Sequence, residues 1–101
     1  MIIARKEISL KTYIDLHIHS TASDGTFSPT EIINEALKLS GKENPVVLAL
    51  TDHDTVSGIE EFQKVAFKHK KQLTTISGVE ISTNYHGVEI HLLGYNINPL
   101  N

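Results

Sequence analysis

The apolar segment Val46–Leu50 constrains the fold of this 101-residue chain more than any other feature. Five consecutive apolar residues, two of them valine, are typical of a strand that is buried on both faces, as in a parallel sheet. A parallel neighbour requires a crossover connection, which is usually a helix. Helical patterns lie on both sides of this segment, so the sequence predicts an α/β fold.

Periodicity and end signals predict the other elements. Residues 13–19 alternate as in a strand, with Ile14, Leu16 and Ile18 on one face and Tyr13, Asp15, His17 and His19 on the other. Ser-x-x-Glu capping boxes at residues 28–31 and 57–60 predict two helices, the first over Pro29–Ser40 and the second closing at residues 69–71. Further strands are expected over residues 72–76, 77–83 and 88–97, the last two joined by a hairpin turn at 84–87.

Composition excludes several classes of function. Nine basic and twelve acidic residues give a net charge of −3, so no broad DNA-binding surface is expected. Cysteine is absent, which excludes disulfides and thiolate metal sites. No apolar stretch approaches the roughly 20 residues that cross a bilayer, and residues 1–10 carry Arg5, Lys6 and Glu7 where a secretory signal would be apolar. We therefore expect one soluble, cytoplasmic domain over residues 1–101, with no membrane partner.

Residues that can bind metal lie along or after the predicted strands, where they can converge at one end of the sheet. Ligands of α/β folds bind at this end. Six residues are candidate metal ligands, and through bound metal they are the candidate catalytic residues: His17, His19, Asp24, His53, Glu80 and His91. Imidazole and carboxylate without thiolate suit Mn²⁺, Zn²⁺ or Fe²⁺, and six ligands favour more than one ion. Such a cluster acidifies bound water and clamps phosphate oxygens, so hydrolysis of a phosphate ester is the expected reaction.

Three further carboxylates are expected to support the ligands. Asp52 and Asp54 flank His53, and one of them should orient His53 or a neighbouring ligand. Asp15, predicted on the same face as the histidines, is a similar candidate. Taken alone, Asp24 in Ser-Asp-Gly is also an ordinary turn residue.

Several motifs carry a family resemblance. The segments Asp15–Ser20, Ser23–Gly25, Thr51–Asp54, Gly78–Ile81 and His91–Tyr95 resemble, in order, the N-terminal motifs of the PHP (polymerase and histidinol phosphatase) superfamily. The sequences of these motifs are most similar to those of small stand-alone bacterial PHP phosphoesterases, which act on nucleotide phosphates and short RNA ends. The resemblance implies the N-terminal part of a distorted, TIM-like (β/α)7 barrel, truncated in this chain.

The same resemblance implies a site for up to three divalent ions. His17 and His19 would bind the first ion, and Glu80 would bridge it to a second ion held by His91. Asp24 and His53 would hold the third.

Two hypotheses follow from these patterns. The first is a metal-dependent phosphoesterase that acts on a phosphorylated small molecule or a short nucleic acid. The second is a non-catalytic metal-binding or assembly module, because a partial barrel leaves a sheet edge open through which copies of the chain could associate.

Overall fold

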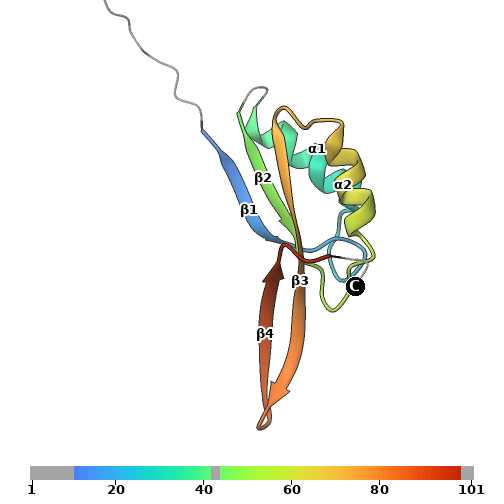
Figure 1. Ribbon diagram of the computed structural model, residues 1–101, viewed down its shortest axis with the longest axis vertical. Helices are drawn as coiled ribbons and strands as arrows, with labels where there is room; N and C mark the ends of the chain where they lie inside the picture. Colours follow the sequence, from blue (N-terminus) through green and yellow to red (C-terminus); the bar gives the residue numbers. More distant parts are fainter. Residues whose placement is uncertain (1–10, 42–43, 99–101) are drawn as a thin grey trace, which may run out of the picture.

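The sheet connects all four strands of the described part of the chain in the order β1-β2-β3-β4. The computed structural model describes residues 11–41 and 44–98, and the prediction made for residues 1–10 lies outside this part. The elements are β1 (Tyr13–Ile18), α1 (Pro29–Ser40), β2 (Val46–Leu50), α2 (Ile59–Phe67), β3 (Leu73–Tyr85) and β4 (Val88–Tyr95) (Figure 1). Pairing is parallel for β1–β2 and β2–β3 and antiparallel for β3–β4. The predicted α/β architecture is confirmed.

Both helices cover one side of the parallel strands (Figure 1). The core lies between them and β2, where Ile33, Leu48, Leu50 and Phe62 are fully buried. Each such side chain contributes roughly 1.5–3 kcal/mol by leaving water. No helix among residues 11–41 and 44–98 is long and apolar enough to span a bilayer.

The two predicted capping boxes have different outcomes. In α1 the box is complete: the Ser28 hydroxyl accepts from the Glu31 amide at 3.1 Å, and the Glu31 carboxylate accepts from the Ser28 amide at 2.9 Å. The prediction of the second capping box is wrong, because α2 begins after Gly58, which offers no side-chain cap. Instead the Ser57 amide donates to the Thr55 hydroxyl, and the Ser57 hydroxyl accepts from it, a local turn that competes with capping. Residues 69–71 lie in turns beyond the end of α2.

The alternation predicted for residues 13–19 is also wrong at its far end. The register between β1 and β2 shifts between Asp15 and Ile18. As a result Ile18 packs against the core together with Tyr13, whereas Ile14 and Leu16 are exposed. An irregularity in the ladder breaks the two-residue period, which a sequence pattern does not register.

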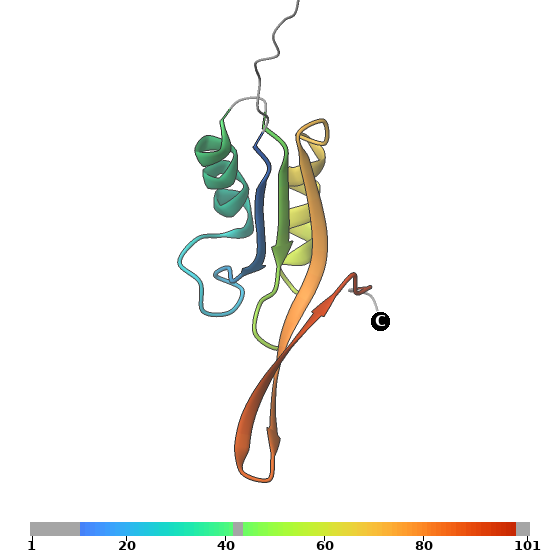
Figure 2. The ribbon, with the colours of Figure 1, turned by 90° about the vertical axis from the view of Figure 1, so that its left-hand side faces the viewer.

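The strands predicted over residues 72–76 and 77–83 are one continuous strand, β3. Its first half pairs with β2, and its second half pairs with β4 to form a hairpin that projects beyond the parallel sheet (Figure 2). The hairpin prediction is confirmed. Its two-residue turn, His86-Gly87, has φ of 52° and 80°, the positive values that a tight hairpin turn of this length requires.

Candidate metal centre

The candidate ligands come from β1, β3, β4 and the loops that follow β1 and β2. His17 lies near the carboxyl end of β1, and His53 lies just beyond β2. The segment around His53 continues the pairing of β2 with β3: Asp54 donates its amide to the Glu80 carbonyl at 2.9 Å, and the Glu80 amide donates to the Asp52 carbonyl at 3.0 Å. These bonds hold Glu80 at the carboxyl ends of the parallel strands.

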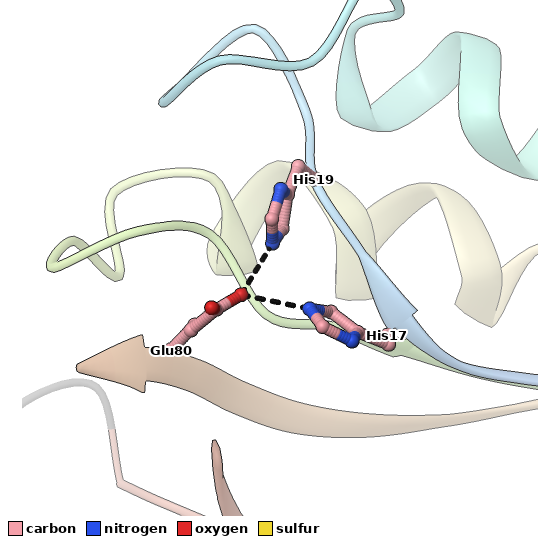
Figure 3. A group of neighbouring side chains, drawn as sticks. All are labelled: His17, His19 and Glu80. Atoms are coloured by element: carbon pink, nitrogen blue, oxygen red, sulfur yellow. Dashed lines mark hydrogen bonds and ion pairs between the residues drawn. The ribbon is translucent and has the colours of Figure 1, made fainter. Parts of the chain in front are cut away.

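Glu80 occupies the centre of the site. Its Oε1 atom lies 2.7 Å from Nε2 of His17 and 2.8 Å from Nε2 of His19, and Figure 3 shows both imidazoles pointing at this oxygen. Its Oε2 atom lies 3.0 Å from Nδ1 of His91. One buried carboxylate therefore faces imidazoles from two different strands and one loop.

Asp24 joins the remaining histidine to this cluster. Its Oδ1 atom lies 3.0 Å from Nδ1 of His19, and its Oδ2 atom lies 3.2 Å from Nε2 of His53. The ring centroids of His19 and His53 are 4.2 Å apart. All six residues selected from the sequence thus lie in one group of contacts.

The neighbouring imidazoles favour the ionised form of Glu80. The hydrogen bond with His17 is the largest effect that lowers the pKa of Glu80, from 4.5 to about 2. The bond with His19 and the charge of His53 lower this pKa further, whereas burial acts in the opposite direction. The carboxylate therefore stays ionised, and available to bind a cation, well below pH 4.5.

The donor set fits divalent metal ions. Three overlapping groups each bring their donor atoms within 4.8 Å of one another: His17, His19 and Glu80; His19, Asp24 and His53; and His53, Glu80 and His91. Ligands of one ion lie about 3 Å apart, because metal–donor distances are about 2.0–2.2 Å. The contacts of 2.7–3.2 Å at Glu80 and Asp24 match this separation. Nitrogen and oxygen donors without sulfur suit Mn²⁺, Fe²⁺ or Zn²⁺.

The three carboxylates expected to support the ligands lie at different places. Asp52 is buried and accepts bonds from Ser20 and Ser23 in the loop after β1. Asp54 accepts from the Ser82 amide at 2.9 Å, next to Glu80 on β3. Asp15 accepts from the His17 amide at 3.2 Å. Within the described residues none of the three bonds an imidazole ring, so any support reaches the ligands through the chain segments that carry them.

Sequence reasoning missed three residues around the site. Ser20 and Ser23 donate to Asp52, and Tyr95 on β4 donates its hydroxyl to the Leu16 carbonyl on β1 at 2.6 Å. The position of Ser20 directly after the two histidines was the available signal. Nothing in the sequence pattern indicates the Tyr95 contact, which joins residues 79 positions apart.

Comparisons with known proteins agree with this geometry. A family model described as PHP domain matches residues 15–99. A 5'-3' exoribonuclease from Haemophilus influenzae is 50% identical over 82 residues, and a 3',5'-nucleoside bisphosphate phosphatase from Chromobacterium violaceum is 38% identical over 86 residues. These matches cover 81% and 85% of this chain but 28% of each relative.

A solved structure extends the comparison to the backbone. An amidohydrolase from Chromobacterium violaceum, solved with bound sulfate, superimposes with a TM-score of 0.75 and 36% sequence identity. The match covers 87% of this chain and 29% of that structure. The chain therefore spans less than a third of the length of the proteins it matches, and its curled sheet corresponds to part of their fold.

Proposed function

The chain belongs to the PHP domain family, and on this premise we propose that it acts as a metal-dependent phosphoesterase, with nucleotide or short RNA phosphates as substrates. The observation that carries the proposal is the position of Glu80. One carboxylate contacts His17, His19 and His91 at 2.7–3.0 Å, as a residue shared by two metal ions would have to do. A single structural ion would need only about four donors, and this cluster holds six.

Each group of donors has a proposed role. His17 and His19 would hold one ion, Glu80 would be shared with a second ion held by His91, and Asp24 with His53 would hold a third. When bound, Mn²⁺, Zn²⁺ or Fe²⁺ ions would supply Lewis acidity, which activates water and neutralises charge on phosphate oxygens.

The chain's own residues prepare this chemistry. The lowered pKa of Glu80, about 2 instead of 4.5, keeps its carboxylate ionised in mildly acidic solution as well as at neutral pH, so protons compete little with a cation. The side chains of His17 and Asp24 are 51% and 63% exposed, which leaves the cluster open to a substrate. The buried side of the cluster is formed by Glu80 and by the strand pairing around it, so the exposed donors are held on a rigid support.

The relatives support the substrate class. Two of the relatives carry the names of an exoribonuclease and a nucleoside bisphosphate phosphatase, and one structural neighbour holds sulfate, an anion with the tetrahedral shape of phosphate. Nucleotides and RNA fragments arise in the cytoplasm, which is the proposed location.

The test is phosphate release by the purified chain. We would supply Mn²⁺, Zn²⁺ or Fe²⁺ in turn with a 3',5'-nucleoside bisphosphate or a 5'-phosphorylated RNA oligonucleotide. Release is expected with at least one metal, and a chelator should abolish it. Glu80→Gln should lower the rate at least about 100-fold, because it removes a shared ligand.

The matched control is His69→Gln, which alters an exposed histidine that belongs to none of the three donor groups. Its rate should equal that of the wild type. Absence of turnover with every metal, or equal rates in the wild type and Glu80→Gln, would contradict the proposal.

A second candidate function is a metal-binding or assembly module without turnover. It is favoured by the exposed apolar residues of the β3–β4 hairpin, which include Ile81, Val88 and Leu92. Metal binding and self-association without phosphate release would support this alternative.

A further inference from the structure

We propose that Asp52 is a positioning residue whose buried carboxylate holds the loop of residues 20–25, here called the Asp24 loop, in the conformation that presents Asp24 to His19 and His53. The inference deepens the proposed function and rests on the metal site described above. In this role Asp52 contacts neither an ion nor a substrate, but fixes the loop that contributes Asp24 to one of the three donor groups.

In the part of the chain that the structure describes, the side-chain hydrogen bonds of Asp52 all lead to the Asp24 loop. Oδ1 accepts from the Ser20 amide at 2.6 Å and from the Ser23 hydroxyl at 2.6 Å, and Oδ2 accepts from the Ser20 hydroxyl at 2.7 Å. Asp52 is only 2% exposed. Three short hydrogen bonds from one loop to one buried carboxyl group make this side chain a strong anchor.

The rest of the loop is organised around the anchored Ser20. Its carbonyl accepts from the Ser23 amide at 3.0 Å and from the Gly25 amide at 2.8 Å, and its hydroxyl accepts from the Ala22 amide at 3.1 Å. The turn is tight: a Cβ on Gly25 would lie 2.0 Å from the His19 carbonyl oxygen. The path of the loop therefore follows from where Asp52 holds Ser20.

Asp24 has little else to fix its position. Its side chain is 63% exposed, and in the described part of the chain it contacts only the two imidazoles. Exposed ion pairs contribute little to conformation by themselves. The placement of the Asp24 carboxylate 3.0 Å from His19 and 3.2 Å from His53 is therefore set by the loop beneath it.

The chemistry of Asp52 also favours a positioning role. Its three side-chain donors are a backbone amide and two hydroxyls, all uncharged, so this buried carboxyl group is held by hydrogen bonds from the loop alone among the described residues. Such burial is costly unless every acceptor site is satisfied, and an apolar residue would serve the core better. The carboxylate is explained by the loop it shapes.

The first experiment measures amide hydrogen exchange of the metal-free chain. In Asp52→Asn an amide group replaces one acceptor oxygen, and in Ser23→Ala one donor is lost without altering a buried position. Both variants should raise exchange at Ser20 and Gly25 by at least about tenfold while amides of β2 stay protected. Unchanged exchange at these two amides would overturn the anchor.

The matched control for this experiment is Glu61→Gln. The Glu61 carboxylate likewise accepts an amide and a hydroxyl bond from one earlier residue, Thr30, at 3.2 and 2.7 Å, but far from the cluster. Exchange in the Asp24 loop should stay at the wild-type rate in this variant. A rise equal to that in Asp52→Asn would mean that any lost carboxylate contact loosens the loop, and would overturn the specific role.

The second experiment counts Mn²⁺ ions by native mass spectrometry. Asp52→Asn should bind one ion fewer than the wild type, and adding Asp24→Ala to it should cause no further loss, because both changes act on the same ion. An unchanged count in a variant with a loosened loop would overturn the positioning role. A wild-type chain that binds no Mn²⁺ would overturn the proposed function and this role with it, while the exchange data would still decide whether Asp52 anchors the loop.

Discussion

Glu80 accepts hydrogen bonds from His17 and His19, and these contacts lower its pKa from 4.5 to about 2. A carboxyl whose pKa is lower in the folded state stabilises the fold above its unfolded pKa, and this contribution is lost as the pH falls from 4.5 toward 2. We expect the urea midpoint of the metal-free wild type to fall more steeply than that of Glu80→Gln between about pH 5 and pH 2.5. Parallel curves for the two proteins would contradict the role of these bonds.

Substitution of single ligands should remove different numbers of ions. His17 belongs to one donor group, whereas Glu80 belongs to two. His17→Ala should therefore lose bound metal with little change in circular dichroism, and Glu80→Gln should lose at least two ions together. Metal analysis of the purified variants measures both. Metal content unchanged in His17→Ala would remove that residue from the site, and loss of no ion in Glu80→Gln would remove its shared role.

At this scale the sequence predicted which residues come together but not how they are held. The ligand candidates were recognisable because His17, Asp24, His53, Glu80 and their neighbours occur in ordered motifs of distinctive residue types. That Asp52 or Asp54 would orient a ligand was predicted, but which of them, which ligand and through which contacts were not, because these depend on the path that residues 20–25 take through space. A residue type indicates chemistry, whereas a contact between distant segments requires the fold.

Among the elements, the two capping boxes offer a direct comparison. Ser28 caps α1 in the structure, and Ser57 does not cap α2. Ser28→Ala should lower the free energy of unfolding by about 1 kcal/mol, because it leaves a helix amide without its partner. Ser57→Ala should change it by less than about 0.5 kcal/mol, as an exposed substitution outside a cap. Urea unfolding of both variants tests this, and equal effects would contradict the assignment of the caps.

The limits of element prediction have physical causes. The bounds of α1 and β2 were predicted correctly because capping, buried apolar pattern and helix stop signals agree there. Two strands were predicted where the structure has the single strand β3. The two halves of β3 pair with different partners, so no single periodicity runs through the strand. The end of β1 was misassigned for a related reason, since a register shift changes the face of Ile18.

The whole molecule exposes an apolar surface on the hairpin. Cross-strand register places Ile81 opposite Leu92 and Tyr85 opposite Val88, on one face, and these four residues are 45–63% exposed. Soluble monomers rarely leave apolar patches of several hundred Å² uncovered. We expect the isolated chain to self-associate through this hairpin face at micromolar concentration, as measured by sedimentation velocity.

Leu92→Lys should shift that equilibrium toward monomers, because a charge would be buried between two copies. Leu39→Lys is the matched control, since Leu39 is 68% exposed on α1, away from the hairpin. A monomeric wild type, or equal effects of the two variants, would contradict association through this face.

At the level of the whole fold, the sequence predicted an α/β sheet with the site at the carboxyl ends of its strands. The projection of the hairpin was not predictable, because it depends on β3 continuing past the end of β2. The link from Tyr95 to Leu16 is likewise a property of the assembled sheet, since these residues share no local pattern.

The double pairing of β3 also bears on the order in which the chain folds. The β3–β4 hairpin closes over two residues and can form in about 1–10 μs. The parallel pairing of β2 with β3 must wait for the intervening α2 connection, which makes it the slower event. We therefore expect Glu80 and His91 to meet before His17, His19 and His53 join them. A divalent cation present during refolding would bind after that step and act as a kinetic marker of its completion.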